Sequence, residues 1–187
     1  LQAKRNLIPV ELSEQIYKLY QSTDSKLQSE VPNEFTTTEE IEIMANKFFT
    51  DIFSEIKGVE LAINELRNFK ASKQPNDQAL FTCIIHNLFD EYRFFEQYPP
   101  EVLAKVGLLF GTLIQQNIIV AKTLRYALIY VLQALNNPQK PKMLQFGLIA
   151  LNQFKARLPE WPEFCSHLRN IPQVAQMLPE VVYYINR

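Results

Sequence analysis

The fold is decided by two neighbouring stretches, PEVLAKVGLLFGTLIQQ (residues 100–116) and VAKTLRYALIYVLQALN (residues 120–136). Apolar side chains surround both stretches almost completely, whereas a helix on a protein surface needs only one apolar face. Two helices of this kind must be covered on both sides, as in a stack of helical hairpins. Gly107 and Gly111 stand four residues apart on one face of the first stretch, so we predict that a neighbouring backbone approaches closely there.

The distribution of glycine and proline extends this interpretation along the chain. Four Gly stand against eleven Pro; sheets need Gly-rich turns, whereas proline fits the first turn of a helix. We therefore predict an all-α fold, an irregular stack of antiparallel helical hairpins without a strict sequence repeat. The predicted helices span residues 9–20, 38–55, 59–70, 75–94, 100–116, 120–136, 141–157, 159–169 and 172–187, the last of them broken at Pro179.

Two segments of different composition make up the chain. Residues 1–35 contain the first predicted helix and a linker rich in Ser, Gln and charge, while residues 36–187 form the predicted helical domain. Thr37 with Glu40 three residues later is a capping box, which marks the start of that domain's first helix. Since the sequence begins with Leu1 and shows no signal peptide, we expect a piece excised from a longer chain.

The overall composition excludes several classes of protein. Nineteen Lys and Arg against twenty Asp and Glu give a net charge of -1, which argues against a protein that binds polyanions through clustered positive charge. Two cysteines cannot form a disulfide framework and fit a reducing compartment. The longest charge-free apolar stretch, between Lys105 and Lys122, is too short to cross a membrane.

No combination of residues predicts catalysis, a metal site or a cofactor. Cys83 with His86 and Cys165 with His167 supply the number of ligands that a zinc site needs. The Cys-x-His spacing is poor, because residues two apart on a helix do not face each other. Gly-rich phosphate loops and the common hydrolase motifs are absent from the sequence. Asp90 is expected to pair with Arg93 on the surface rather than to act as a general acid or base.

Basic residues form two pairs. Lys155 and Arg157 lie near a predicted helix C-terminus, where the helix dipole favours cations. Lys140 and Lys142 stand at the start of a predicted helix and could touch RNA, although two charges contribute little affinity. We expect a solvated loop there.

The predicted helix 38–55 carries more apolar residues than one packed neighbour can cover. Its expected core stripe consists of Ile41, Met44, Ala45, Phe48 and Ile52. Phe49 and Phe53 stand four apart on the flank of this stripe, and Ile56 follows between the two sets. Either the fold buries both sides, or the second side borders an open groove that receives the apolar face of a partner peptide.

Several stretches together resemble a known family. They are NLFDEYRFFEQYP (residues 87–99), LRYAL (124–128), VLQAL (131–135), FGLIAL (146–151) and FKARL (154–158). From about Thr38 to the end, the chain is similar to the tristetraprolin-binding domain in the large scaffold subunit of the CCR–NOT mRNA deadenylase complex. The resemblance implies an irregular HEAT/MIF4G-like stack of helical hairpins and a docking module without catalysis.

In that family, short motifs of RNA-binding regulators, among them the C-terminal peptide of tristetraprolin, fold as a helix onto a hydrophobic groove. The groove aromatics match Phe49 and Phe53, with Phe53 in place of the family's Tyr. We predict a peptide-binding site made of Phe49, Phe53, Ile56 and Ile52. The implied partners are tristetraprolin-like adaptor motifs and, through flanking regions, other subunits of the complex, in the cytoplasm and nucleus. Membrane and direct nucleic-acid contacts are not expected.

Two other functions stay open at this point. The domain could serve as a structural spacer in a long helical solenoid. A surface without an exposed apolar patch would favour this function. It could also bind RNA directly around Lys140 and Lys142, in which case binding would weaken steeply with added salt.

Overall fold

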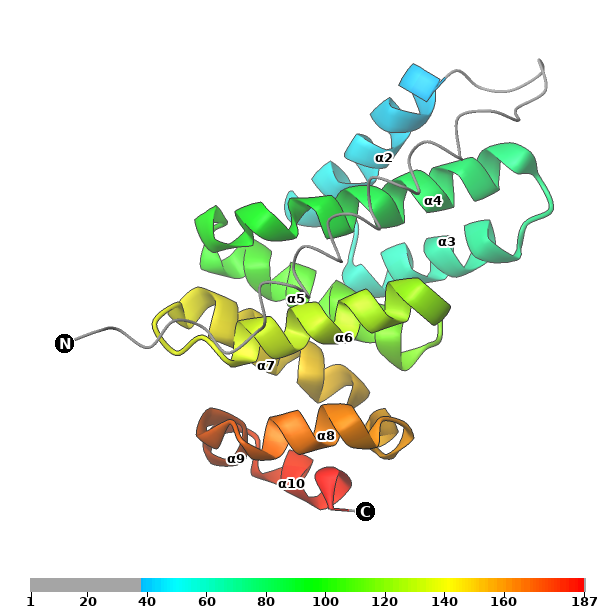
Figure 1. Ribbon diagram of the computed structural model, residues 1–187. Coiled ribbons are helices and arrows are strands. Elements are labelled where there is room, and N and C mark those ends of the chain that lie inside the picture. Colours follow the sequence, from blue (N-terminus) through cyan, green and yellow to red (C-terminus); the bar gives the residue numbers. More distant parts are fainter. Residues whose placement is uncertain (1–37, 187) are drawn as a thin grey trace. The chain divides into compact units, whose positions relative to one another are not determined.

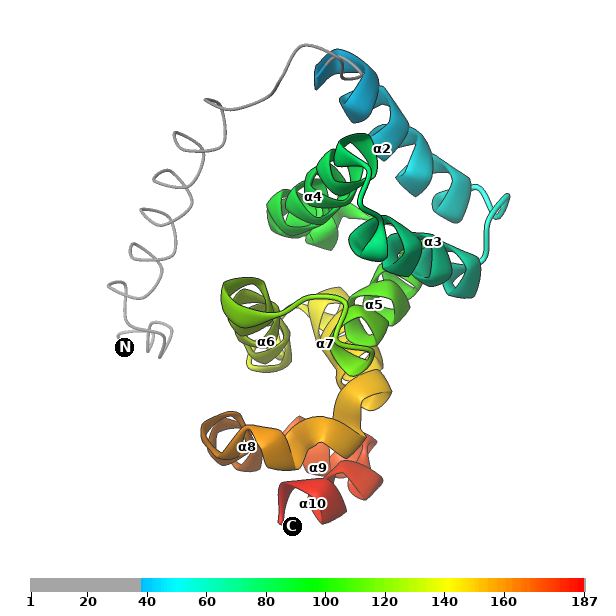
Figure 2. The same cartoon turned by 90° about the vertical axis from the view of Figure 1, so that its right-hand side faces the viewer.

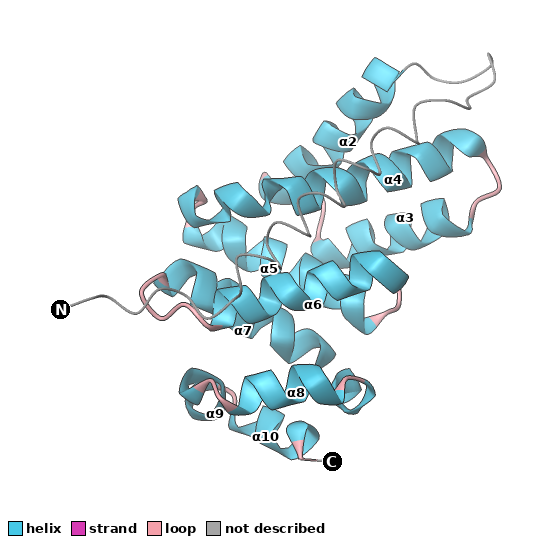
Figure 3. Ribbon diagram, viewed as in Figure 1, coloured by secondary structure: helices cyan, strands magenta, loops and turns pink. Residues whose placement is uncertain are grey.

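The computed structural model describes residues 38–186; its regular secondary structure there is entirely helical, with no strand among these residues. The predicted helix 9–20, the linker after it and Thr37 of the capping box lie outside the described residues, so the boundary near residue 35 stays a prediction. Figure 3 shows helices joined by short loops, as the all-α prediction requires.

The helices follow one another from α2 at one end to α10 at the other (Figures 1 and 2). Proline stands in the first turn of six of them, where its missing N–H costs no hydrogen bond. The elements are α2 (Thr38–Phe53), α3 (Val59–Ala71), α4 (Pro75–Asp90), η1 (Glu91–Gln97), α5 (Pro100–Gln115), α6 (Ala121–Leu135), α7 (Pro141–Phe154), η2 (Lys155–Glu160), α8 (Pro162–Arg169), α9 (Pro172–Met177) and α10 (Pro179–Ile185).

The ends of two predicted helices differ from the prediction. The helices expected to reach Phe94 and Arg157 end earlier and continue as the 3₁₀ segments η1 and η2. Pro159 lies inside η2, and the helix expected to begin there begins at Pro162 instead. Periodicity could not reveal these changes, since a 3₁₀ turn keeps apolar residues at nearly the same spacing as an α-helix.

The centre of the core is the crossing of α5 and α7. Gly107 and Gly111 of α5 face α7, and a Cβ atom added at Gly111 would lie 2.8 Å from the Cα of Ala150. The predicted close approach is therefore confirmed. It brings together large side chains that are fully buried, among them Phe110, Phe146 and Phe154.

Helix α2 lies at the edge of this core. It packs mainly on α4 and has only slight contact with α3. Ala45, Phe48 and Ile52 are buried as predicted, but the prediction for Met44 is wrong, because its side chain is 49% exposed. A helix covered chiefly by one neighbour cannot bury its whole apolar arc.

Candidate functional site: an aromatic pocket beside α2

A cavity of about 430 Å³ opens between α2, α4, η1 and α5. Apolar side chains from all four elements reach it, together with polar ones from α2, α4 and η1. Its lining consists of Asn46, Phe49, Thr50 and Phe53 from α2, Asn87, Leu88 and Asp90 from α4, Glu91 and Phe95 from η1, Tyr98 after η1, and Val106 from α5.

Aromatic rings form one wall of the pocket. Phe49 and Phe53, one helical turn apart, stack with ring centroids 6.1 Å apart. Tyr98 meets Phe53 edge to face at 6.0 Å and lies 5.5 Å from Phe95. Such contacts add to the hydrophobic gain of burying the rings and hold them in one arrangement. The wall is therefore continuous from α2 to η1.

The rest of the lining includes polar and acidic side chains. It presents the side chains of Asn87, Asp90 and Glu91. Burial of the ring, and secondly the charge of Glu91, raise the pKa of Tyr98 to about 12. A hydrogen bond from the Tyr98 hydroxyl to the Glu91 side chain raises this pKa further and joins the aromatic ring to an acidic residue of the lining.

The four predicted site residues occupy different positions. Phe49 and Phe53 are half-buried and line the pocket, which is the open-groove alternative of the sequence analysis. Ile52 is 1% exposed, so its side chain belongs to the core beneath α2 and cannot contact a partner in this conformation. Ile56 is 74% exposed but does not line the pocket. Whether any of them binds a peptide stays a prediction.

Sequence reasoning missed the second half of the pocket, which comes from η1 and the residue that follows it. Phe95 and Tyr98 were quoted only as part of a family resemblance, and Asp90 only as a surface partner of Arg93. That ion pair is present, with 2.7 Å between Arg93 Nη2 and Asp90 Oδ2. The spacing of the aromatic residues was the available signal, since Phe95 and Tyr98 stand three residues apart.

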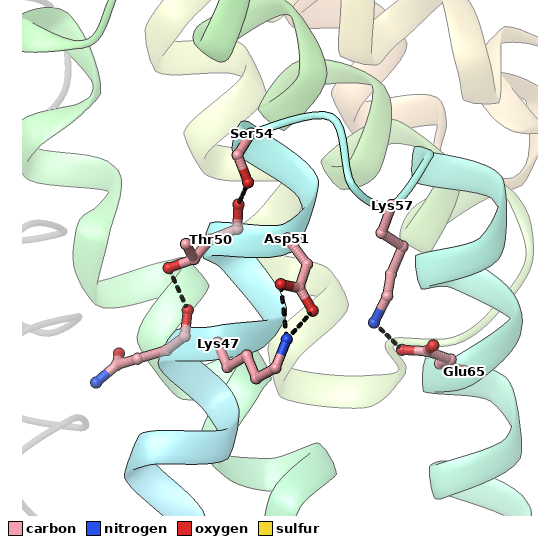
Figure 4. A network of polar contacts seen from close by, with 7 residues as sticks. Lys47, Thr50, Asp51, Ser54, Lys57 and Glu65 are labelled. Carbon is pink, nitrogen blue, oxygen red and sulfur yellow. Dashed lines mark hydrogen bonds and ion pairs between the residues drawn. The ribbon is translucent and has the colours of Figure 1, made fainter.

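The side of α2 that faces α3 carries ion pairs instead of a pocket (Figure 4). Lys47 pairs with Asp51 at 2.7 Å along α2, and Lys57 pairs with Glu65 of α3 at 2.6 Å. The side chain of Thr50, which lines the pocket, points away from these two ion pairs. The two flanks of α2 therefore differ, one being aromatic and hollowed and the other charged.

Both basic pairs of the sequence analysis have partners within the chain. Lys140 forms an ion pair with Glu96, and Lys142 donates hydrogen bonds to backbone carbonyls of the η1 end. The loop is solvent-exposed as expected at Pro138, Gln139 and Lys140, although the side chains of Lys140 and Lys142 also contact η1 and the residue after it. Lys155 pairs with Glu180 at 3.1 Å, and Arg157 donates to the carbonyl of Ile114. These contacts give the RNA-binding alternative no support.

The cysteine–histidine pairs lie far apart in the order of elements, on α4 and α8. Among residues 38–186, no three His, Cys, Asp or Glu side chains are placed to hold a metal ion. Cys165 is buried and donates to the carbonyl of Leu158. None of the helices described is long and apolar enough to cross a membrane.

Comparison with curated proteins gives relatives of one kind. The chain is 41% identical over 147 residues to General negative regulator of transcription subunit 1 of Schizosaccharomyces pombe, covering 73% of this chain. It is 31% identical over 147 residues to the Saccharomyces cerevisiae protein of the same name, with 76% of this chain covered. The CCR4-NOT transcription complex subunit let-711 of Caenorhabditis elegans is 29% identical over 152 residues, with 79% covered. The chain spans only 6–7% of the length of these relatives.

A solved structure and a family model agree with these relatives. The N-terminal domain of the yeast Not1 superposes with a TM-score of 0.73 at 29% identity, over 81% of this chain and 29% of that one. Residues 10–187 match the model of the CCR4-NOT transcription complex subunit 1 TTP binding domain. The family is described as a binding domain and its relatives as regulator and complex subunits, so the prediction of a non-catalytic domain is confirmed. The chain therefore belongs to the family of the CCR4-NOT transcription complex subunit 1 TTP binding domain.

Proposed function

We propose that this domain docks short helical motifs of RNA-binding regulators in the pocket beside α2, and that it thereby recruits their mRNAs to the deadenylase. The observation that supports this most strongly is the half-buried pair Phe49 and Phe53 on the wall of an open cavity. The domain belongs to a family named for binding TTP. The expected partner is a tristetraprolin-like motif, and other subunits of the complex would join through flanking regions.

The pocket has the dimensions for one or two apolar anchors. A cavity of about 430 Å³ lies within the range of ligand sites in proteins. Burying one Leu, Ile or Phe side chain against the rings gains about 1.5–3 kcal/mol. Because the motif must become ordered as it binds, part of this gain is lost and the affinity should be moderate. Regulation of the motif by phosphorylation fits such a moderate interaction.

The proposal is tested by calorimetric titration of the domain with a synthetic C-terminal peptide of tristetraprolin. Phe49→Ala and Phe53→Ala should each weaken binding at least about tenfold, because aromatic anchors at the centre of an interface carry most of its energy. Ile43→Ala is the matched control, since Ile43 is an exposed apolar residue of α2 that does not line the pocket. It should bind as the wild type does.

Thermal unfolding separates docking from folding. Phe49→Ala and Phe53→Ala should keep the helical circular dichroism and melt close to the wild type, because both rings are only partly buried. Phe48→Ala, at a buried ring of the same helix, should lose about 3–5 kcal/mol of stability. Unchanged peptide binding in both pocket variants, or a stability loss as large as that of Phe48→Ala, would contradict the proposal.

A further inference from the structure

Two rings of the aromatic wall stand at the ends of helices. Phe53 is the last residue of α2, and Tyr98 follows directly on η1. The last carbonyl groups of a helix have no hydrogen-bond partner within it, so helix ends fray unless another group binds them. The positions of these two rings therefore depend on what binds the carbonyls near them.

A lysine from α5 binds the end of α2. Lys105 Nζ donates to the carbonyl of Phe53 at 3.2 Å and to the carboxylate of Glu55 at 3.0 Å. Glu55 has a φ of 63°, a left-handed conformation that side chains other than glycine seldom adopt. Val106, the residue after Lys105, lines the same pocket. Through Lys105, the backbone of Phe53 is therefore hydrogen-bonded to α5, the helix that also supplies Val106 to the pocket.

A second lysine, from α7, binds the end of η1. Lys142 Nζ donates to the carbonyl of Tyr98 at 3.0 Å and to that of Glu96 at 3.1 Å. Lys105 and Lys142 thus make the same kind of contact with the backbones of two adjacent wall residues, Phe53 and Tyr98, whose rings meet at 6.0 Å.

Both lysines belong to the two helices that cross at the centre of the core. α5 and α7 cross where the backbone of Gly111 lies against that of Ala150. Densely packed helices move little, so they can serve as a fixed reference for the surface elements that they hold. The exposed carboxylate of Glu55 adds little to this, because a pair with one well-solvated partner is worth little.

We propose that Lys105 and Lys142 are positioning residues of the docking site: by binding the carbonyls of Phe53 and Tyr98, they hold the two rings in the arrangement that receives a peptide. The inference rests on the proposed function and adds to it the residues that preorganise the pocket. Preorganisation raises affinity because the free protein does not have to order these side chains on binding.

The experiment compares Lys105→Met and Lys142→Met with the wild type by two measurements. The first is the nuclear Overhauser effect between the rings of Phe53 and Tyr98 in the free protein, and the second is the affinity for the tristetraprolin peptide. Methionine replaces the unbranched aliphatic part of lysine but lacks the ammonium group and cannot donate. Lys70→Met is the matched control, because Lys70 also binds a carbonyl at a helix end, that of Asn117 at 2.8 Å, away from the pocket.

Lys105→Met and Lys142→Met should both lose most of the ring-to-ring signal. Each should weaken peptide binding about three- to tenfold, the size of effect that one lost charged hydrogen bond can produce. Lys105→Arg, which can still donate to both acceptors, should restore signal and affinity. Lys70→Met should change neither the ring-to-ring signal nor the affinity, even if it lowers the melting temperature as much as Lys105→Met and Lys142→Met do.

An unchanged ring-to-ring signal in both methionine variants would overturn the inference. A lost signal with unchanged affinity would overturn it too, since the arrangement of the rings would then not matter for docking. If the wild type binds no peptide, the proposed function fails, and the signal alone decides whether the lysines hold the rings.

Discussion

At the scale of single residues, Tyr98 joins the aromatic wall of the pocket to the acidic residue Glu91. Its ring contacts Phe53 and Phe95, and the charge of Glu91 and a hydrogen bond with its side chain raise the pKa of the Tyr98 hydroxyl. The pKa of Tyr92, which is partly buried and donates to the carbonyl of Tyr130 at 2.9 Å, is raised as well, chiefly by burial. Both phenols are therefore held in the neutral form by the folded chain.

This shift predicts how stability depends on alkaline pH. Tyr98 has a pKa of about 12 in the folded protein against 10 ordinarily, so between these values the unfolded chain releases a proton that the folded chain retains. The free energy of unfolding should be unaffected by this group below pH 10 and should fall as the pH rises from 10 to 12. Chemical unfolding of the wild type and of Tyr98→Phe across this range measures the effect.

Tyr98→Phe cannot ionise at this position, so its stability should decline less steeply over the same pH range. Comparing the two slopes cancels the titration of lysines and other groups that both proteins share. Equal slopes would show that the environment of Tyr98 does not favour its neutral form.

At the scale of elements, the crossing of α5 and α7 depends on Gly111. A Cβ atom there would lie 2.8 Å from the Cα of Ala150, a backbone atom that cannot rotate away. Gly111→Ala should therefore force the helices apart and cost about 1–3 kcal/mol of stability. Gly58→Ala is the control, since a Cβ at Gly58 meets nothing within 4 Å. Urea unfolding of both variants measures the difference; equal stability would mean that the helices do not approach this closely.

The positions of the helices were predictable from the sequence. The 3₁₀ geometry at two helix ends, and the extent to which each helix is covered by its neighbours, were not. Apolar periodicity, with a first-turn proline in α5, placed α3, α5 and α6 within one or two residues. The change to 3₁₀ geometry at η1 and η2 depends on tertiary contacts that periodicity does not record. The exposure of Met44 has a similar origin, because only the packed structure reveals that α2 rests mainly on α4.

At the scale of the whole domain, the pocket depends on elements that are distant in sequence. α2 supplies Phe49 and Phe53, η1 supplies Phe95, and α5 supplies Val106. Helical periodicity predicts which face of each helix is apolar. It does not predict which part of that face stays uncovered by other helices in the folded chain. For this reason, the helical pattern could single out Phe49 and Phe53 but could offer an open groove beside them only as one of two alternatives.

Exposed apolar residues are not confined to the pocket. Met177 and Tyr183 are both more than half exposed near the other end of the domain, on α9 and α10. A partner peptide with apolar anchors could in principle dock there instead. A test of the central claim must therefore survey every surface of the domain at once.

The most direct measurement is a titration of the ¹⁵N-labelled domain with the C-terminal tristetraprolin peptide, followed by amide chemical shifts. The largest shifts should fall on residues around the pocket, in the second half of α2, in η1 and at Tyr98, and should be absent from Phe49→Ala at the same peptide concentration. Shifts that gather on α9 and α10, or that persist unchanged in Phe49→Ala, would contradict the assignment of docking to the aromatic pocket.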